Sequence, residues 1–378
     1  MIRLFLLLNP VYVTLFWAII LNLYDRKVYA AKVFLGRFMF TAFILYVSHL
    51  FYFLCLFHIY IFLDSFYTWA SLSVYPMFHI YVRLLIIDKF FSFKKHSIYL
   101  VAPTIIFLLL VAGYLLMNKE ERIYYVSQVL TGAEKGKGIT AYMHVVYLAG
   151  RLIFIVQTVL YLVLNFRLIL NNNRVLQNFY SNIESRKLGW VQFFNICMAF
   201  TSISSISLAV IGREKFLNHE YYLILPSLIF SLMLFIIGYL GNKQRQIFSE
   251  KRALKVVSTY TVDEAIPDKL KEDLITLFKN KKVYLQKDLK IWDISGFLAT
   301  NRTYISRIIN QDFDMNFCSF VNNYRIEHAK NLLAQNKHYS NEEIAELSGF
   351  GSVNSFYRVF KQKENISIGK YREEKFKK

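Results

Sequence analysis

Long apolar stretches dominate the first 242 residues. The hydrocarbon core of a bilayer is about 30 Å thick, and a helix needs about 20 mostly apolar residues to cross it. Inside lipid, every backbone N–H and C=O group must bond within the protein, so such stretches fold as helices. We identify seven of them, at about 4–24, 33–57, 62–87, 97–117, 142–166, 190–211 and 221–240. The pattern predicts a seven-helix transmembrane bundle. The very short connection at residues 58–60 leaves six spans as the alternative.

Composition divides the chain near residue 242. The whole chain is 55% apolar, above the roughly 45–50% of soluble proteins, and the excess lies in the first part. The remainder is charged like a soluble domain, and its basic excess suits nucleic acid or the anionic face of a membrane. We therefore predict a polytopic transmembrane sensor domain at 1–242, a cytoplasmic connector at 243–267 and a soluble domain at 268–378.

The distribution of Lys and Arg predicts the orientation in the membrane. The first, third and fifth connections and the segment after the last stretch carry most of these residues, and the alternate connections carry about half as many. The N-terminus is therefore expected outside and the C-terminal domain in the cytoplasm, an arrangement that seven spans produce and six do not. The expected location is the bacterial cytoplasmic (inner) membrane, with a multi-pass chain and the lipid bilayer as a partner.

Two ionisable residues fall in the outer halves of predicted spans. Such groups are costly in lipid, so they face a bundle interior or a wet cavity. Asp64 and Arg151 could form a structural pair, or each could reach water at its own interface. Alternatively, they line an outward-facing ligand pocket with Tyr67, Trp69 and Tyr147, which would receive a small-molecule or envelope signal.

The sequence carries no motif of catalysis or metal binding that we recognise. HExxH, GxSxG and Gly-rich phosphate loops are absent, and the histidines of the first part lack metal-ligand spacing. Cys55, Cys197 and Cys318 show neither disulfide-framework nor metal spacing. We expect a protein that is not an enzyme, with no cofactor and no metal.

Two helix-turn-helix patterns occupy the soluble part, and the second is the clearer. Ser340 can cap a helix over 341–347, Gly349 supplies a turn residue that tolerates positive φ, and Ser352 can cap a helix over 353–363. Such a pair of short helices is typical of DNA-binding helix-turn-helix units, although single turns of this kind are also common in other proteins.

The first pattern is similar. Helices are expected over 268–280 and 288–298, and Asn301 can cap a further helix over 302–310. A long helix over 317–336 joins the two patterns and spans about 30 Å. Because one turn of B-DNA is about 34–36 Å, a rod of that length can place two recognition helices in successive major grooves. The soluble part is thus predicted to be all-α, with two helix-turn-helix units joined by a long helix.

The residues about 268–374 resemble the DNA-binding domain of AraC/XylS-type transcriptional regulators. This resemblance covers over a quarter of the chain and implies recognition helices in adjacent major grooves of double-stranded promoter DNA. Members of the family often act as dimers, so a homodimer is one possible form of the protein. It rests on several motifs in order, at Ile294–Ser295, Thr303–Arg307, Arg325–Leu333, Ile344–Phe350, Ser355–Lys361 and Tyr371–Arg372.

The resemblance also implies which side chains contact DNA. Arg binds guanine bidentately, Asn suits adenine and Val meets the thymine methyl group, whereas Lys more often contacts phosphate. Carried over by position, the contacts of the first groove come from Arg302, Thr303, Ser306 and Arg307, and those of the second from Val353, Asn354, Tyr357, Arg358 and Lys361.

The sequence departs from the family pattern at four positions. Ser295 stands where a small Ala is usual, Ile368 replaces a Pro, and Asp314 and Asn365 stand where Gly is favoured. Because Asp and Asn tolerate left-handed backbone, we expect the fold to survive. The membrane half lies outside the usual family pattern, so no effector is implied.

Together these features predict a membrane-embedded one-component transcriptional regulator with sequence-specific DNA binding, controlled by its transmembrane domain. The main alternative is a membrane receptor or transporter whose basic cytoplasmic tail binds protein partners. A membrane enzyme is the least favoured class.

Overall fold

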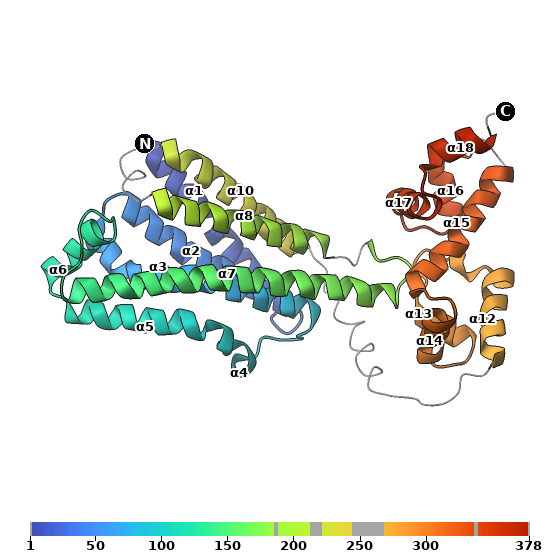
Figure 1. Ribbon diagram of the computed structural model, residues 1–378, viewed down its shortest axis with the longest axis horizontal. Coiled ribbons are helices and arrows are strands. Elements are labelled where there is room, and N and C mark those ends of the chain that lie inside the picture. The colour runs from blue at the N-terminus through green and yellow to red at the C-terminus, as the bar shows by residue number, and fades with distance from the viewer. Residues whose placement is uncertain (1, 185–187, 212–220, 244–267, 336–338, 377–378) are drawn as a thin grey trace. The chain divides into compact units, whose positions relative to one another are not determined.

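The chain is built from helices, which confirms the all-α prediction. The computed structural model describes residues 2–184, 188–211, 221–243, 268–335 and 339–376. Within these ranges there is no strand, and an isolated antiparallel bridge joins Tyr180 to Lys290. The chain divides into two compact units, residues 1–169 with 189–249 and residues 170–188 with 250–378 (Figure 1). Most of the predicted connector, residues 244–267, lies outside the described residues.

The first unit is a bundle in which a helix covers each of the seven predicted stretches. α1 packs against α2 and α10, α2 against α3, and α3 against α5 (Figure 1). The long helices are α1 (Ile2–Asn22), α2 (Ala30–Phe53), α3 (Phe57–Ile86), α5 (Val101–Leu116), α7 (Ile139–Gln177), α8 (Gly189–Ile211) and α10 (Tyr221–Lys243). Short helical segments lie between them: α4 (Phe93–His96), η1 (Ser97–Leu100), α6 (Lys119–Tyr124) and the π-helical η2 (Tyr125–Val129).

Five helices among the described residues are long and apolar enough to cross a membrane. They are Arg3–Asn22, Ala30–Phe53, Phe93–Leu116, Ile139–Gln177 and Pro226–Lys243. α3 is not among them; its sequence carries His, Tyr, Ser, Thr and Asp residues, which lower its mean hydropathy. α8 contributes a shorter apolar helix over Gly189–Ile203. The count of seven spans therefore stays a prediction.

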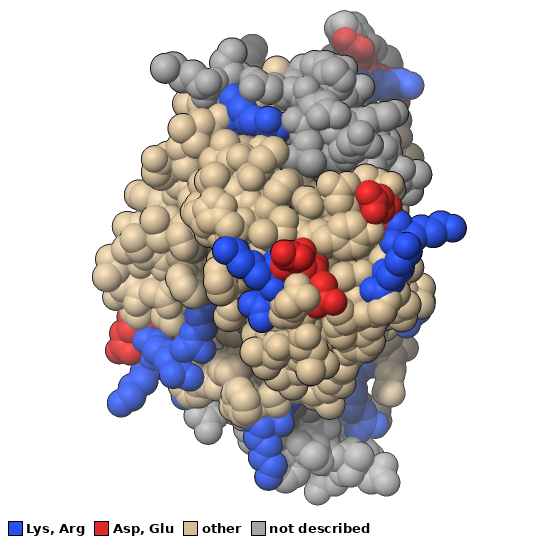
Figure 2. Space-filling model, turned by 90° about the vertical axis from the view of Figure 1, so that its left-hand side faces the viewer, with Lys and Arg blue, Asp and Glu red and all other residues tan. Residues whose placement is uncertain are grey.

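The surface of the first unit is sparsely charged. Figure 2 shows a face that is mostly uncharged, with Lys, Arg, Asp and Glu in a few small groups. Large apolar side chains are exposed along α5 and α7, among them Leu115 and Leu116, each 75% exposed, and Leu152, 65% exposed. These faces have no partner within the described part of the unit.

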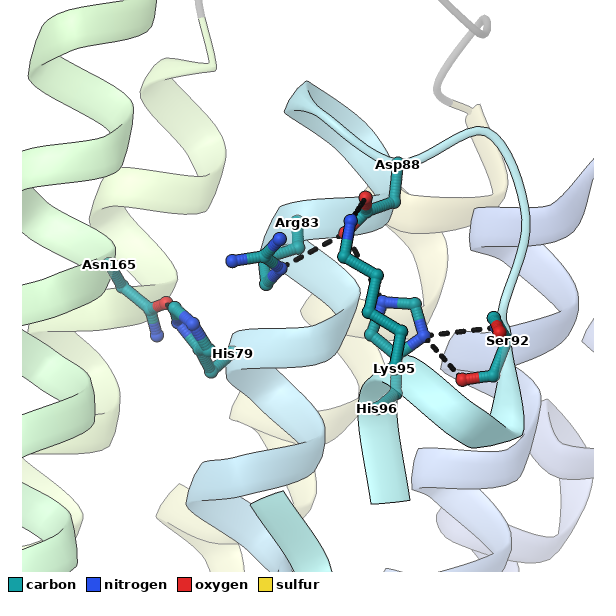
Figure 3. Close-up of polar contacts among 7 residues, drawn as sticks. All are labelled: His79, Arg83, Asp88, Ser92, Lys95, His96 and Asn165. Carbon is teal, nitrogen blue, oxygen red and sulfur yellow. Dashed lines mark hydrogen bonds and ion pairs between the residues drawn. The ribbon is translucent and has the colours of Figure 1, made fainter. Parts of the chain in front are cut away.

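Polar side chains inside the first unit bond to one another. Asp64 on α3 is buried and accepts hydrogen bonds from the hydroxyl groups of Tyr60 and Tyr114, each at 2.8 Å. Further along α3, the His79 Nδ1 lies 2.7 Å from the Asn165 Oδ1 on α7 (Figure 3). These bonds give partners to the Asp64 carboxylate, the His79 ring and the Asn165 carbonyl oxygen, which would be costly to bury alone.

Asp88, just after α3, lies at the centre of a charged cluster (Figure 3). Its carboxylate accepts hydrogen bonds from Arg83 Nε at 3.0 Å and from Lys95, and its Oδ2 lies 3.2 Å from the Nε2 of buried His96. The other His96 ring nitrogen lies 2.9 Å from the Ser92 carbonyl oxygen. Burial acts to raise the pKa of Asp88, but the hydrogen bonds from Lys95 and His96 and the Arg83 charge outweigh it and lower that pKa. The cluster ties the end of α3 to α4.

The second unit contains both helix-turn-helix patterns at the predicted places. Its helices are α12 (Asp268–Lys281), η4 (Val283–Leu285), α13 (Ile291–Phe297), α14 (Arg302–Asp312), α15 (Phe317–Gln335), α16 (Asn341–Leu347), α17 (Val353–Glu364) and α18 (Ile368–Phe376). α15 contributes Phe317, Phe320 and Val321 to a first core and Ile326, Ala329 and Leu333 to a second. It is therefore the shared helix of two small cores.

Local signals fix the starts of three of these helices as predicted. The Asn301 side chain accepts from the Thr303 N–H, Ser340 forms a capping box with Glu343, and Ser352 accepts from the Ser355 N–H. Capping supplies acceptors for N–H groups that have no partner within the helix. The departures from Gly are also accommodated: Asp314 and Asn365 adopt positive φ, at 50° and 60°.

Candidate nucleic-acid interface

The two recognition helices bury one face and expose another. On α14, Ile305, Ile308 and Ile309 are buried, and on α17, Phe356 and Phe360 are buried. The residues expected to contact DNA lie outside these buried stripes. Arg302, Thr303, Ser306, Arg307 and Val353 are half-buried, and Asn354, Tyr357, Arg358 and Lys361 are exposed.

Several of these side chains already have partners within the second unit. The Ser306 Oγ accepts from Asn310 Nδ2 at 3.2 Å, and the Tyr357 hydroxyl accepts from Asn341 Nδ2 at 3.2 Å. Burial lowers the pKa of Arg302, whose guanidinium lies over the Phe179 ring at 5.5 Å. The guanidinium of Arg358 pairs with Glu184 at 3.1 Å.

Arg325 holds the two halves of the domain together, a role that its place in the long-helix motif did not reveal. Its side chain is buried, and it donates from Nε to the Tyr284 carbonyl and from Nη2 to the Gln286 carbonyl, each at 2.7 Å. Its guanidinium also lies 5.8 Å from the centre of the Phe350 ring, in the second half. Burial lowers the pKa of Arg325 to about 10, so the group stays charged at neutral pH.

Gly349 brings the second turn against the first half. Its φ is 79°, and a Cβ at this position would lie 2.6 Å from the Leu285 carbonyl oxygen. Only glycine adopts this backbone without strain and leaves room for that approach. An ion pair between Lys287 and Glu346, at 2.9 Å, spans the same junction. The turn before α17 is therefore fixed relative to the segment before α13.

The two candidate ligand residues of the first unit lie in different places. Arg151 lines a cavity of about 580 Å³ between α1, α2, α3, α7, α8 and α10, whereas Asp64 is not among the lining residues. The guanidinium of Arg151 lies 5.4 Å from the centre of the Tyr147 ring, and no carboxylate in the described part of the chain forms an ion pair with it. His49 and Tyr67 also line the cavity, with His49 Nε2 3.2 Å from the Tyr67 hydroxyl.

Comparison with known proteins identifies the C-terminal part alone. Residues 294–374 match the model of a family described as a helix-turn-helix domain. The chain is 31% identical over 90 residues to the uncharacterized HTH-type transcriptional regulator YtdP of Bacillus subtilis (strain 168), which covers 24% of this chain and 12% of that protein. A Staphylococcus aureus (strain COL) relative, the uncharacterized HTH-type transcriptional regulator SACOL0084, is 29% identical over 94 residues, again 24% and 12%.

A third relative is the uncharacterized HTH-type transcriptional regulator YfiF of Bacillus subtilis (strain 168), 34% identical over 88 residues, which is 23% of this chain and 27% of that protein. The chain thus matches between about an eighth and a quarter of the length of these relatives. No solved structure matches it. The similarity lies within the second unit, and residues 294–374 of this chain form a helix-turn-helix domain of the kind that these regulators carry.

Proposed function

We propose that the chain is a membrane-embedded transcriptional regulator that binds promoter DNA through α14 and α17. The observation that carries the proposal is the equal register of these two helices. After the caps Asn301 and Ser352, the residues at the first, second, fifth and sixth positions are the expected DNA contacts in both, outside the buried stripe. In helix-turn-helix proteins the N-terminal part of the recognition helix meets the base edges.

Each contact has a distinct chemical task. Arg307 and Arg358 read guanine with two hydrogen bonds, Asn354 reads adenine, and Val353 packs against a thymine methyl group. Lys361, at the exposed ninth position of α17, contacts phosphate and supplies affinity without sequence preference. The remaining expected DNA contacts on α14 and α17 are Arg302, Thr303, Ser306 and Tyr357.

The apolar outer faces support the membrane location of the first unit. Burying apolar surface is worth about 25 cal/mol per Å², and soluble monomers rarely expose large apolar patches. Exposed side chains such as Leu116 and Leu152 would be stable against lipid. With the Lys and Arg asymmetry of the connections, this supports the proposed topology, in which the N-terminus lies outside and the second unit lies in the cytoplasm, at the inner membrane of a bacterium.

The cavity is the proposed input site of the regulator. Its walls are mostly apolar, and Arg151 brings to it a guanidinium for which the described chain supplies no carboxylate. Arg binds carboxylates and phosphates with two hydrogen bonds, and the volume is in the range of small-molecule sites. An amphiphile with an apolar body and one anionic group fits this lining. Asp64, outside the lining, holds Tyr60 and Tyr114 in place.

Selection of DNA by the intact protein tests the main proposal. The full chain in lipid nanodiscs is incubated with random duplexes, and the bound duplexes are sequenced through successive rounds. Enrichment of one sequence pattern is expected, and it should be lost from part of the pattern in Arg307→Ala. Lys370→Ala on α18 is the charge-matched control and should keep the pattern. Absence of any enrichment would favour the alternative, a receptor or transporter whose basic tail binds protein partners.

A further inference from the structure

A short segment that follows α7 is built into the DNA-binding domain. We name residues 178–184 the docking segment. The Ser181 N–H donates to the Leu289 carbonyl at 3.0 Å, and the Ile291 N–H donates to the Phe179 carbonyl at 3.1 Å. These bonds flank the antiparallel bridge between Tyr180 and Lys290. The docking segment thus pairs through its backbone with residues 289–291, at the start of α13, within the second unit.

Side chains add to this pairing. Tyr180 is buried with Ile183 and meets the Trp292 ring edge-on, with ring centres 5.3 Å apart. The buried Arg325 donates to the Ser181 Oγ at 3.2 Å, and the Cys318 Sγ donates to the Ser181 carbonyl at 3.3 Å. The docking segment therefore shares the polar contacts that organise the domain.

The same segment reaches both recognition helices. Phe179 lies under the guanidinium of Arg302 at the start of α14. The Glu184 carboxylate accepts a hydrogen bond from the Ser352 Oγ at 2.8 Å and pairs with Arg358 at 3.1 Å. Asn182 packs against Gly351 so closely that a Cβ on this glycine would lie 2.7 Å from the Asn182 Cγ. A carboxylate thus occupies the N-terminal turn of α17, where base edges and phosphates would otherwise come.

We propose that the docking segment is an intramolecular competitor of DNA. Glu184 uses the positive N-terminal end of α17 and the charge of Arg358, the two features of this helix that attract an anion. In the docked state, the Glu184 carboxylate repels DNA phosphates and the docking segment covers part of the surface of α14 and α17 that would contact DNA. When the docking segment dissociates, the whole of this surface can bind DNA. Apparent affinity then falls in proportion to the undocked fraction. The inference rests on the proposed function and adds its regulation.

The position of the docking segment in the chain connects this competition to the first unit. The two units divide within α7, after Ile169, so the docking segment is the direct continuation of a helix that begins in the first unit. A movement of α7 on ligand binding therefore acts directly on the equilibrium between the docked and undocked states, because the docking segment follows α7 without an intervening element. The Glu184–Arg358 pair is partly exposed, at 33% and 49%, and such a pair shifts an equilibrium by about fivefold or less. The docked state is therefore readily reversible.

A reducible lock tests the competition directly. Cysteines in place of Asn182 and Gly351 have Cβ atoms within about 4.5 Å, which is within the reach of a disulfide. The full chain with Asn182→Cys and Gly351→Cys, and with Cys55, Cys197 and Cys318 replaced by Ser, is placed in nanodiscs. Its binding to the selected duplex is measured oxidised and again after reduction. Each preparation is its own control, since the substitutions are the same in both states.

We expect oxidation to lower the affinity for DNA about tenfold or more and reduction to restore it. Equal affinity in the two states would overturn the proposal, as would failure of the disulfide to form under oxidation. These results differ from failure of the proposed function, in which the chain selects no DNA sequence in either state.

A charge variant gives an independent reading. Glu184→Gln removes the anion from the start of α17 and is expected to raise the affinity for the selected duplex about two- to fivefold. Glu374→Gln on α18 removes an equal charge that pairs only with Lys370 among the described residues. Equal effects of the two variants would indicate general electrostatics and contradict a specific role for Glu184.

Discussion

The carboxylate of Glu184 lies 3.1 Å from the guanidinium of Arg358, although the two residues are far apart in the sequence. Arg358 is one of the side chains expected to read DNA, and Glu184 belongs to a segment that continues a helix of the first unit. The ion pair joins the residues that follow α7 to the N-terminal part of α17.

Two substitutions on α17 should separate base reading from phosphate binding. Lys361→Ala is expected to weaken binding to all duplexes alike and to reduce the slope of log affinity against log salt by about 0.9. Asn354→Ala is expected to weaken the free energy of binding to the selected sequence by about 1–3 kcal/mol. It should also reduce the preference for one base at a single base pair. Titrations of matched and substituted duplexes at several salt concentrations measure both. A change of sequence preference in Lys361→Ala would contradict the assignment.

Removal of the buried guanidinium should loosen the second unit. Arg325→Met keeps similar volume but leaves the Tyr284 and Gln286 carbonyls without their donor. Each of the two carbonyls left without a partner costs about 1–3 kcal/mol, so the free energy of opening the second unit is expected to fall by about 2–6 kcal/mol. Amide hydrogen exchange of α15 and α16 in the full chain measures it. Lys361→Ala is the control and should leave exchange unchanged.

Two glycines should respond to alanine with opposite signs. Gly349→Ala places a Cβ against the Leu285 backbone at positive φ and is expected to destabilise the second unit by about 1–3 kcal/mol. Gly369 lies within α18 with nothing near its Cβ position. Gly369→Ala should therefore stabilise that helix by about 0.5–1 kcal/mol. Denaturant unfolding monitored by hydrogen exchange compares the stabilities of the variants. If Gly349→Ala is as stable as the parent chain, Gly349 does not lie as close to the Leu285 backbone as described.

The Asp88 cluster should make the end of α3 sensitive to acid. Because the pKa of Asp88 is lowered in the folded protein, its ionised form contributes stability that is complete above the unfolded-state pKa of about 3.9. This contribution is lost as the pH falls through the lower folded-state pKa. Asp88→Asn is expected to reduce the thermal stability of the detergent-solubilised chain at neutral pH.

The difference between Asp88→Asn and the parent chain should shrink as the pH falls below about 4. Thermal unfolding over a range of pH values measures this. Glu120→Gln, an exposed carboxylate on α6, is the control and should show no such pattern. A constant difference at all pH values would mean that the ionised form of Asp88 is not responsible.

The cavity should prefer anionic amphiphiles through Arg151. A fluorescent fatty acid is expected to bind the parent chain and to bind Arg151→Gln about tenfold less tightly, because the anionic group loses its bidentate partner. Arg151→Lys should keep part of the affinity, since it retains the charge. Arg167→Gln, an exposed position on the same helix, is the control. Equal affinity in Arg151→Gln and Arg167→Gln would reject the site.

Local sequence signals predicted the second unit well. The caps at Asn301, Ser340 and Ser352, and the positive φ of Gly349, depend on residues a few positions apart. Asp314 and Asn365 adopt left-handed backbone where the family favours Gly, as their side chains allow. In the first unit a helix covers each apolar stretch, because length and hydropathy suffice to find it. That these helices cross a membrane remains a prediction.

The sequence did not predict contacts between residues that are far apart along the chain. The pairing of Tyr180 with Lys290 joins a polar stretch after α7 to the start of α13, and nothing in either stretch signals the other. Asp64 shows both cases: Tyr60 is one helical turn away on α3, whereas Tyr114 comes from α5. The structure likewise separates Asp64 from the cavity that Arg151 lines.

The approach of Gly349 to Leu285 constrains the promoters that such a protein can use. Since α14 and α17 belong to one stiff body, their separation and their relative twist are set before any duplex arrives. One additional base pair between the two contacted grooves rotates the second by about a tenth of a turn, and the close approach of Gly349 to Leu285 opposes a matching rotation of α17. DNA target sites are therefore expected to differ in the base sequence between the two contacted grooves but to share the same number of base pairs there.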